Sequence, residues 1–179
     1  MTPPGWLVVV DLQTVFGDPQ SPWAAPRFAE IRPRVRALVD AFGDRVVWTR
    51  FVAPDEPAGA WAEYYEQFPF ALAPPESPLY ALVEDTGDHP VVSATTFGKW
   101  GSELAAVVAG GPLTVTGVAT DCCVLSTVLP AADAGVPVRV VTDACAGSTD
   151  DDHRRALDLM ALYAPLVRLA TTDEVLGGA

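Results

Sequence analysis

Short apolar runs recur along the chain and are separated by longer amphipathic segments. Several runs are almost continuously apolar and rich in β-branched residues, which is typical of strands buried on both faces of a parallel sheet. We predict six strands on this pattern, over residues 6–11, 46–51, 90–95, 113–118, 137–142 and 166–170.

The segments between the runs predict helices, because their apolar residues recur every three to four positions. Residues 27–42 show this spacing most clearly, and further helices are predicted over 103–109, 121–134 and 151–163. Pro130 falls inside the third of these, where it should kink or shorten the helix. Alternating strands and helices predict an α/β fold with three αβα layers and right-handed crossovers around a parallel sheet.

The chain has 179 residues, which suits a single domain over residues 1–179. Two predicted connections are longer than usual, over residues 14–26 and 52–80. The second is rich in proline and aromatic residues, so we expect it to be ordered. Long connections at the edge of a sheet are usually functional, which makes this one a candidate wall for a binding pocket.

Composition excludes several classes of partner. The formal net charge is −12, which disfavours binding to nucleic acids and to anionic membrane surfaces. No apolar stretch is long enough to suggest a membrane span, and no leader segment is expected at residues 1–5. The three cysteines lack metal-binding spacing, so free thiols in a reducing cytoplasm are expected. A small molecule is the expected partner.

Residues with reactive side chains follow several of the predicted strands. Ligands of open α/β sheets bind at the carboxyl ends of the strands, where we expect Asp11, Lys99 and residues 117–123 to converge. The segment GVATDCCV, residues 117–124, predicts a sharp strand-to-helix turn with a cysteine in the first helical turn. A helix N-terminus stabilises a thiolate and offers backbone N–H groups to an oxyanion. The alternative is a pair of small residues that pack helix against sheet.

A nucleophilic cysteine needs a base, and the two histidines are poorly placed for it. His89 lies at the start of a predicted strand, at the opposite edge, and His153 reaches the site only through a loop. Asp11 is better placed, and a carboxylate beside Lys99 would be held ionised and would accept the thiol proton. The alternatives are a turn-forming role for Asp11 and a surface position for Lys99, which is the single lysine of the chain.

Four segments stand out together: VVVDLQ, TFGKWG, GVATDCCVLST and AADAGVPVRVVTDA. With them the chain resembles, over about residues 6–175, the isochorismatase-like cysteine hydrolases, a family that includes nicotinamidases and N-carbamoylsarcosine amidase. It implies a Rossmann-like six-stranded parallel sheet of order 3-2-1-4-5-6. Because relatives commonly form dimers or larger assemblies, it also implies a homo-oligomer.

The resemblance further implies a catalytic triad of Asp11, Lys99 and Cys123. Cys123 is chosen over Cys122 because the family nucleophile directly precedes the valine of its CV pair. A cis peptide is implied at Val118–Ala119, and the N–H groups of Ala119 and Cys123 would form the oxyanion hole. Lys99 would keep Asp11 charged and bind the substrate or the developing charge.

The sequence departs from the family pattern at two places. Lys99 lies a few residues later than the family lysine often does, near the position held here by Ser93 or Ala94. Nicotinamidases bind a metal through histidines after the second strand, whereas this chain reads WTRFVAPDEP there and has no histidine. We therefore expect no metal and no other cofactor. Retention of Cys123 favours amide chemistry over vinyl-ether hydrolysis.

The sequence thus predicts a hydrolase of small amides, imides or carbamoyl compounds that works through a thioester. Two alternatives stay open: an enol-ether hydrolase of isochorismatase type with Asp11 as the acid, and a non-catalytic binding protein. Gln13 is expected to anchor the loop near Asp11, Arg50 to pair with an acidic residue, and Cys122 and Cys145 to be structural. The expected substrate pocket is aromatic: Phe16, Phe51, Trp61, Tyr64, Tyr65, Phe97 and Trp100.

Overall fold

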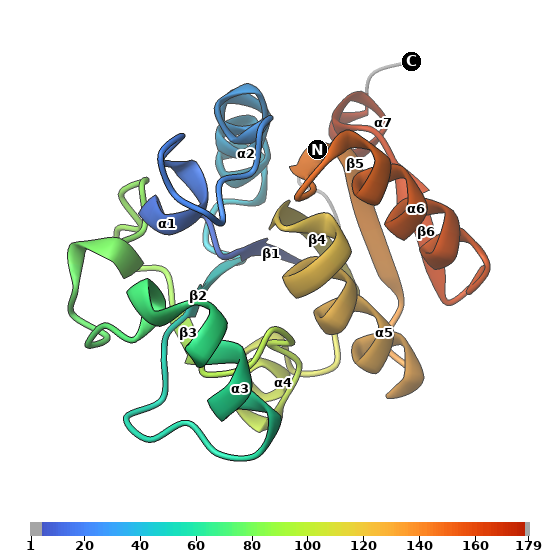
Figure 1. Cartoon of the computed structure of the whole chain (residues 1–179). Helices are drawn as coiled ribbons and strands as arrows, with labels where there is room; N and C mark the ends of the chain where they lie inside the picture. The colour runs from blue at the N-terminus through green and yellow to red at the C-terminus, as the bar shows by residue number, and fades with distance from the viewer. Residues whose placement is uncertain (1–4, 178–179) are drawn as a thin grey trace.

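Six parallel strands form one sheet with helices on both of its faces (Figure 1). The computed structural model describes residues 5–177. The expectation that there is no leader segment concerns mainly residues 1–4, which lie outside the described range. The strand order β3-β2-β1-β4-β5-β6 confirms the predicted topology. The strands are β1 Trp6–Val10, β2 Val46–Phe51, β3 Val91–Ala94, β4 Leu113–Val118, β5 Val138–Ala146 and β6 Val167–Ala170.

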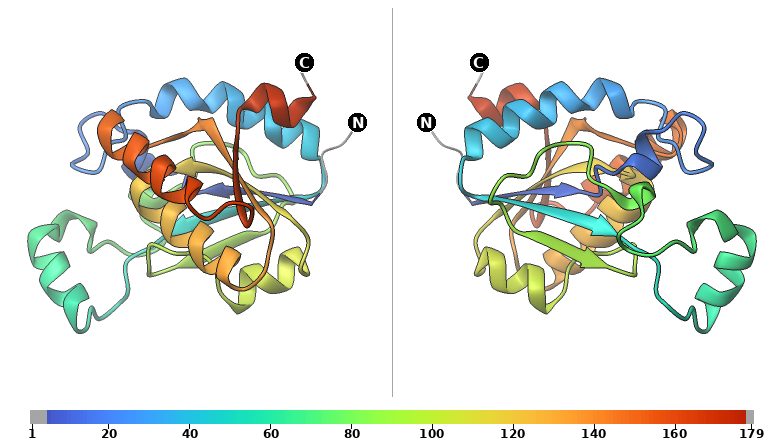
Figure 2. Two further views of the ribbon diagram at one scale, coloured as in Figure 1. Left: turned by 90° about the vertical axis from the view of Figure 1, so that its right-hand side faces the viewer. Right: turned by 90° about the vertical axis from the view of Figure 1, so that its left-hand side faces the viewer.

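Two hydrophobic cores lie on opposite faces of the sheet. One core packs α1 (Thr14–Gly17), α2 (Phe28–Phe42) and α7 (Thr172–Leu176) on the sheet. The other packs α4 (Ser102–Val108), α5 (Leu125–Asp133) and α6 (Asp150–Ala161) on the far face. The two side views show α2 and α7 above the sheet and α4 and α5 below it (Figure 2).

The central strand β1 shows why the apolar runs are continuous. Leu7 and Val9 point into the first core, and Val8 and Val10 point into the second. All four side chains are completely buried. Full burial of one such side chain stabilises the fold by about 1.5–3 kcal/mol, so both faces of the strand contribute.

Several elements differ from the sequence-based prediction. Strand β5 continues to Ala146, past the predicted end at residue 142, after a shift of register opposite residues 115–117 of β4. The third predicted helix is divided into a π-helical turn, Thr120–Val124, and α5, which contains Pro130. Three helices were not predicted: α1, α7 and α3, which spans Ala60–Gln67.

The connection between β2 and β3 forms an excursion over residues 52–80 that extends beyond the end of the sheet (Figure 2). It carries α3 and two 3-10 turns, Pro69–Ala71 and Pro78–Tyr80, so it is ordered as expected. Among residues 5–177, no helix is both long enough and apolar enough to cross a bilayer.

Candidate active site

Asp11 stands directly after the central strand, with its side chain completely buried. Its φ of +48° is unusual for a residue other than glycine. Thr49 on β2 holds it there: the Asp11 N–H donates to Thr49 Oγ1 at 3.2 Å, and the Thr49 hydroxyl donates to Asp11 Oδ1 at 2.6 Å. The backbone and one carboxylate oxygen are thus fixed by a residue that the sequence analysis did not single out.

Lys99 holds the second carboxylate oxygen of Asp11. Its Nζ lies 2.7 Å from Asp11 Oδ2, and both side chains are 0% exposed. The ammonium also donates to the carbonyl oxygens of Thr96 at 3.1 Å and Phe97 at 2.7 Å. These three acceptors match its three protons. Lys99 therefore reaches Asp11 despite its later position in the sequence, but it has no proton left for the substrate, contrary to that expectation.

The loop that carries Lys99 is fastened to the start of α5. The Lys99 N–H donates to Thr127 Oγ1 at 2.9 Å, and the Thr127 hydroxyl donates to the carbonyl of Cys123 at 2.7 Å. Gly98 makes the close approach possible, because a Cβ there would lie 2.5 Å from the Ser126 carbonyl oxygen. In a regular helix the Ser126 carbonyl would accept the N–H of residue 130, but Pro130 has no N–H to donate. One hydroxyl thus links the lysine and the cysteine.

The turn after β4 brings Cys123 to the same edge of the sheet. Gly117, with φ +115°, lies so close to β1 that a Cβ would sit 2.1 Å from the Val10 carbonyl oxygen. The Val118–Ala119 peptide is cis, at the position that the family resemblance implies. The Ala119 carbonyl then accepts hydrogen bonds from the N–H groups of Cys122 at 3.0 Å and Val124 at 3.1 Å.

The outer side of this turn is held by the start of α6. Thr120 Oγ1 lies 2.8 Å from Nδ1 of His153, and the Asp121 carboxylate accepts the Ser148 N–H and hydroxyl, each at 2.8 Å. Burial lowers the pKa of His153, which favours its neutral form. His153 thus supports the turn from outside, through Thr120.

Cys123 is almost completely buried, and its electrostatic surroundings oppose ionisation. A side-chain hydrogen bond with Cys122, burial and the negative charge of Asp11 raise the pKa of Cys123 well above its ordinary value. The positive charge of Lys99 lowers it, but by less. The expectation of a lowered pKa at this helix N-terminus is therefore wrong for the unliganded protein, and Cys123 rests as the neutral thiol.

A pocket of about 160 Å³ opens onto Cys123. Four of the predicted aromatic residues line it: Phe16, Phe51, Tyr64 and Phe97. Ala119 and Cys123 also line the pocket, as predicted. The other lining residues were not predicted to do so, and Cys122 among them was expected to be structural only. They are Pro22, Trp23, Ala24, Cys122 and Ser148.

Three predicted aromatic residues lie outside this lining. Trp61 stands behind it, with its ring centroid 4.9 Å from that of Phe97. Tyr65 is 2% exposed and belongs to the core under α3. Trp100 packs against the core on the opposite face of the sheet. The sequence indicates that all three lie near the site, but it does not show on which side of their backbone the cavity opens.

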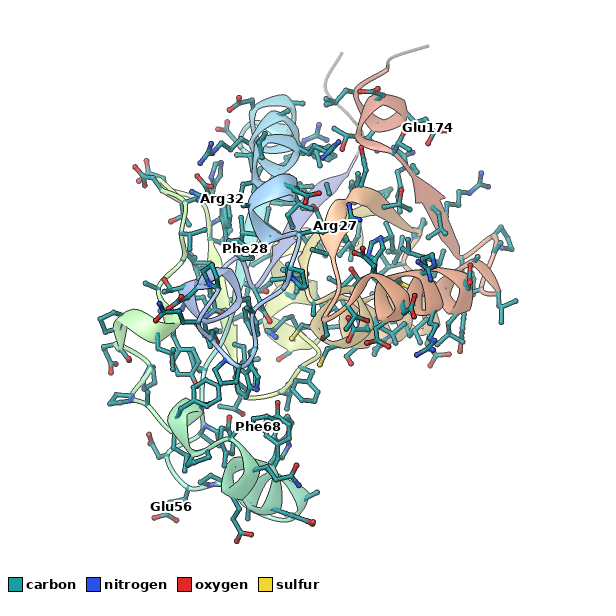
Figure 3. All side chains as sticks on the ribbon, turned by 45° about the horizontal axis from the view of Figure 1, so that its top comes forward. Arg27, Phe28, Arg32, Glu56, Phe68 and Glu174 are labelled. Carbon is teal, nitrogen blue, oxygen red and sulfur yellow. The ribbon has the colours of Figure 1, made fainter. Side chains whose placement is uncertain are left out.

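Gln13 fastens the excursion over residues 52–80 at both of its ends. Its Nε2 donates to the carbonyls of Phe51 and Tyr80, each at 2.9 Å, and its Oε1 accepts the Phe51 N–H at 2.9 Å. The predicted anchoring role is confirmed. Figure 3 shows Phe68 on the side of the excursion that faces the sheet, where its ring lies 5.6 Å from that of Trp23.

Contrary to expectation, Arg50 pairs with no acidic side chain among residues 5–177. Its guanidinium donates to Ser93 Oγ at 3.3 Å and to the Pro75 carbonyl at 3.5 Å. It therefore braces the excursion against β3. The first acidic residues after Arg50, Asp55 and Glu56, lie on the excursion, as Figure 3 shows for Glu56. Cys145 is a buried free thiol, as expected.

Three solved structures share this fold. A cysteine hydrolase from Pseudomonas syringae pv. phaseolicola superposes with a TM-score of 0.84 at 21% identity, over 97% of this chain and 91% of that one. A nicotinamidase/pyrazinamidase from Acinetobacter baumanii gives 0.76 at 20%, over 94% and 96%. A pyrazinamidase from Pyrococcus horikoshii in complex with zinc gives 0.75 at 23%, over 92% and 97%.

The zinc in the last structure raises the question of whether this chain offers metal ligands. The segment after β2, where the family resemblance places the metal-binding histidines, has none here. Within residues 5–177, no three histidine, cysteine or carboxylate side chains gather as a metal ion requires. The described residues do not fit a zinc site.

Membership of a family follows from the sequence together with this geometry. A search of the curated proteins finds no match. The family model of the isochorismatase domain, in contrast, matches residues 5–174, which is nearly the whole chain. The described site lies within this range, at the carboxyl edge of the sheet. The chain therefore belongs to the isochorismatase family of hydrolases.

Proposed function

We propose that this protein hydrolyses the C–N bond of a small neutral amide, imide or carbamoyl compound through a thioester on Cys123. One observation carries the proposal: the buried Asp11–Lys99 ion pair adjoins a buried cysteine that lines a pocket. Both charges act on the pKa of Cys123, so the three side chains are electrostatic neighbours. A carboxylate beside a thiol supplies the base that cysteine catalysis needs.

In the first half of the reaction, Asp11 takes the proton of Cys123 as sulfur attacks the substrate carbonyl. The tetrahedral intermediate collapses, the C–N bond breaks, and Asp11 returns the proton to the leaving nitrogen. In the second half, Asp11 takes a proton from water, whose oxygen attacks the thioester. The C–S bond breaks, Asp11 returns its proton to the sulfur of Cys123, and the acid leaves. Because the resting thiol is neutral, proton transfer accompanies attack rather than preceding substrate binding.

Two other parts of the site act on developing charge. The backbone N–H groups of Ala119 and Cys123, both at the pocket, are proposed to receive the oxyanion, and one such donor is typically worth about 100–1,000-fold in rate. Lys99 compensates the charge of Asp11 while that carboxylate is ionised. Since its three protons are already engaged, its role is electrostatic and positional rather than direct binding of substrate.

The pocket supports a compact and uncharged substrate. Its volume of about 160 Å³ is close to that of an engineered protein cavity of about 150 Å³ that holds benzene. None of the described lining side chains carries a formal charge. A dicarboxylate such as isochorismate would be expected to require cationic partners, so the pocket favours amide hydrolysis over enol-ether hydrolysis.

The test is ammonia release from a panel of small neutral amides, with acid-quenched mass spectrometry of the enzyme. We expect an acyl adduct on Cys123, and a loss of at least about 1,000-fold in Cys123→Ser and Asp11→Asn. Cys145→Ser is the matched control, because that thiol is buried away from the pocket. Turnover that survives Cys123→Ala but not Asp11→Asn would replace the thioester route with acid catalysis. No turnover and no adduct would support a non-catalytic protein.

A further inference from the structure

Tyr64 on α3 carries a phenolic hydroxyl and lines the pocket that holds the two adjacent cysteines. Among the interactions of the described residues, that hydroxyl has no hydrogen-bond partner in the protein. The other tyrosines on the excursion differ: the Tyr80 hydroxyl donates to the carbonyl of Ala71, and the Tyr65 hydroxyl is buried away from the pocket. The Tyr64 hydroxyl is thus a polar group on an aromatic wall, and it binds no other group of the described residues.

The ring of Tyr64 is held in place by its neighbours. Its centroid lies 4.9 Å from that of Phe68, 5.4 Å from Trp61 and 5.6 Å from Phe97. Edge-on and tilted contacts of this kind stabilise a defined ring orientation. Because the ring is already fixed, a hydrogen bond from its hydroxyl costs little further ordering on binding.

Tyr64 is also a donor over the whole physiological pH range. Burial raises the pKa of Tyr64 above its ordinary value, and negative charge on Cys122 or Cys123 raises it further. That both sulfurs act on this group agrees with the place of Tyr64 beside Cys122 and Cys123 in the lining of the pocket. A neutral phenol donates one hydrogen bond and remains a donor when the site becomes anionic.

The other polar side chains of the described lining are engaged or out of reach. The Ser148 hydroxyl donates to Asp121, and the Cys122 thiol is paired with Cys123. The indole nitrogen of Trp23 is buried, so it does not face the open space of the pocket. Tyr64 is therefore the side chain best placed to recognise a polar atom of a bound molecule.

We propose that Tyr64 is a specificity-determining residue whose hydroxyl donates a hydrogen bond to an acceptor oxygen of the bound substrate. This inference rests on the proposed function and deepens it. The hydrogen bond from Tyr64 selects, among small neutral amides, those that carry an oxygen acceptor besides the carbonyl under attack, as imides and ureides do. A pocket built around one hydrogen-bond donor discriminates against analogues that lack the acceptor, because the donor is then left unpaired.

The test uses two alkylating reagents of nearly the same shape, and it needs no turnover. Iodoacetamide carries a carbonyl and an amino group where methallyl iodide carries a methylene and a methyl group. The second-order rate of Cys123 alkylation by each reagent is read by peptide mass spectrometry in wild type, Tyr64→Phe and Tyr65→Phe. Tyr65→Phe is the matched control, because it removes a neighbouring hydroxyl that does not line the pocket.

We expect Tyr64→Phe to slow iodoacetamide by about 3- to 10-fold, the worth of one hydrogen bond between neutral groups, and to leave methallyl iodide unchanged. Tyr65→Phe should alter neither rate. Equal changes with both reagents, or no change with iodoacetamide, would overturn the proposal. Alkylation that follows the expected pattern in a protein without amidase activity would refute the proposed function and leave the role of Tyr64 in recognition standing.

Discussion

Replacement of Lys99 by methionine should strongly destabilise the protein, because it leaves the Asp11 carboxylate charged, buried and unpaired. Both side chains of this pair are 0% exposed, so water cannot take the place of the ammonium. Removing one partner of a buried ion pair costs about 3–5 kcal/mol. With a urea m-value of about 2 kcal/mol/M, the unfolding midpoint should fall by about 1.5–2.5 M.

A double-variant cycle separates the ion pair from general disruption. Asp11→Asn leaves the ammonium of Lys99 unpaired and should also destabilise the fold. The combined Asp11→Asn/Lys99→Met variant leaves neither charge, so it should cost about 2–3 kcal/mol less than the sum of the two single variants. Arg27→Met is the matched control, because its pair with Asp150 is exposed and its loss should leave the midpoint nearly unchanged.

The cycle is measured by urea unfolding of the four proteins at pH 7, followed by tryptophan fluorescence. If the losses in free energy of unfolding of the two single variants added up to that of the double variant, Asp11 and Lys99 would not be coupled. A Lys99→Met midpoint within about 0.5 M of wild type would show that the pair is solvated, against the burial on which the magnitude rests.

Three further predictions concern other residues of the site and its supports. Iodoacetamide should label Cys123 with a pH midpoint above the ordinary thiol value of about 8.5; Asp11→Asn should lower that midpoint and Lys99→Met should raise it. Burial raises the pKa of Cys145 to about 12, so as the pH rises the unfolded state loses the Cys145 proton before the folded state does. The free energy of unfolding should therefore fall by about 1.4 kcal/mol per pH unit above about pH 8.5. Cys145→Ala should flatten that decline in urea unfolding between pH 8.5 and 10.5. Gln13→Leu removes three buried hydrogen bonds and should cost at least about 3 kcal/mol, with limited proteolysis beginning in residues 52–80.

Each of these predictions has an outcome that contradicts it. A labelling midpoint of Cys123 well below 8.5 would mean that Lys99 outweighs burial and Asp11. A Cys145→Ala protein that loses stability with pH as steeply as wild type would assign the alkaline decline to other groups. First cleavage of Gln13→Leu outside residues 52–80 would show that the excursion is held by its aromatic packing alone.

The strands and their order were predictable from the sequence because they depend on a local pattern. Burial on both faces leaves a continuous apolar run in β1, residues 6–10, and a nearly continuous one in residues 113–118, which are also the bounds of the observed β4. The end of β5 was not predictable in this way, since Thr142 and Asp143 break the run although pairing with β4 continues to Ala146. Tertiary pairing there overrides the local signal.

The site was predictable where it depends on residue type and not where it depends on side-chain direction. Asp11 and Lys99 were proposed from their chemistry, and the structure places them in contact. Trp23 was missed because it lies in a proline-flanked loop without periodicity, and its place at the pocket depends on tertiary packing, for example against Phe16 and Phe70. For α7 a signal existed: Thr171 and Glu174 form a capping box, a motif visible in the sequence.

The three hydrogen bonds of Gln13 have a consequence for how the substrate range of this scaffold can be altered. All three partners are backbone groups, those of Phe51 just before the excursion and of Tyr80 at its end, so the attachment does not depend on the side chains at those positions. The attaching residue lies two positions after Asp11, on the part of the chain that carries the proposed base. Residues 52–80 can therefore be treated as an interchangeable cassette: a segment of another sequence that returns its backbone to the same two points would give the proposed catalytic residues a different pocket wall.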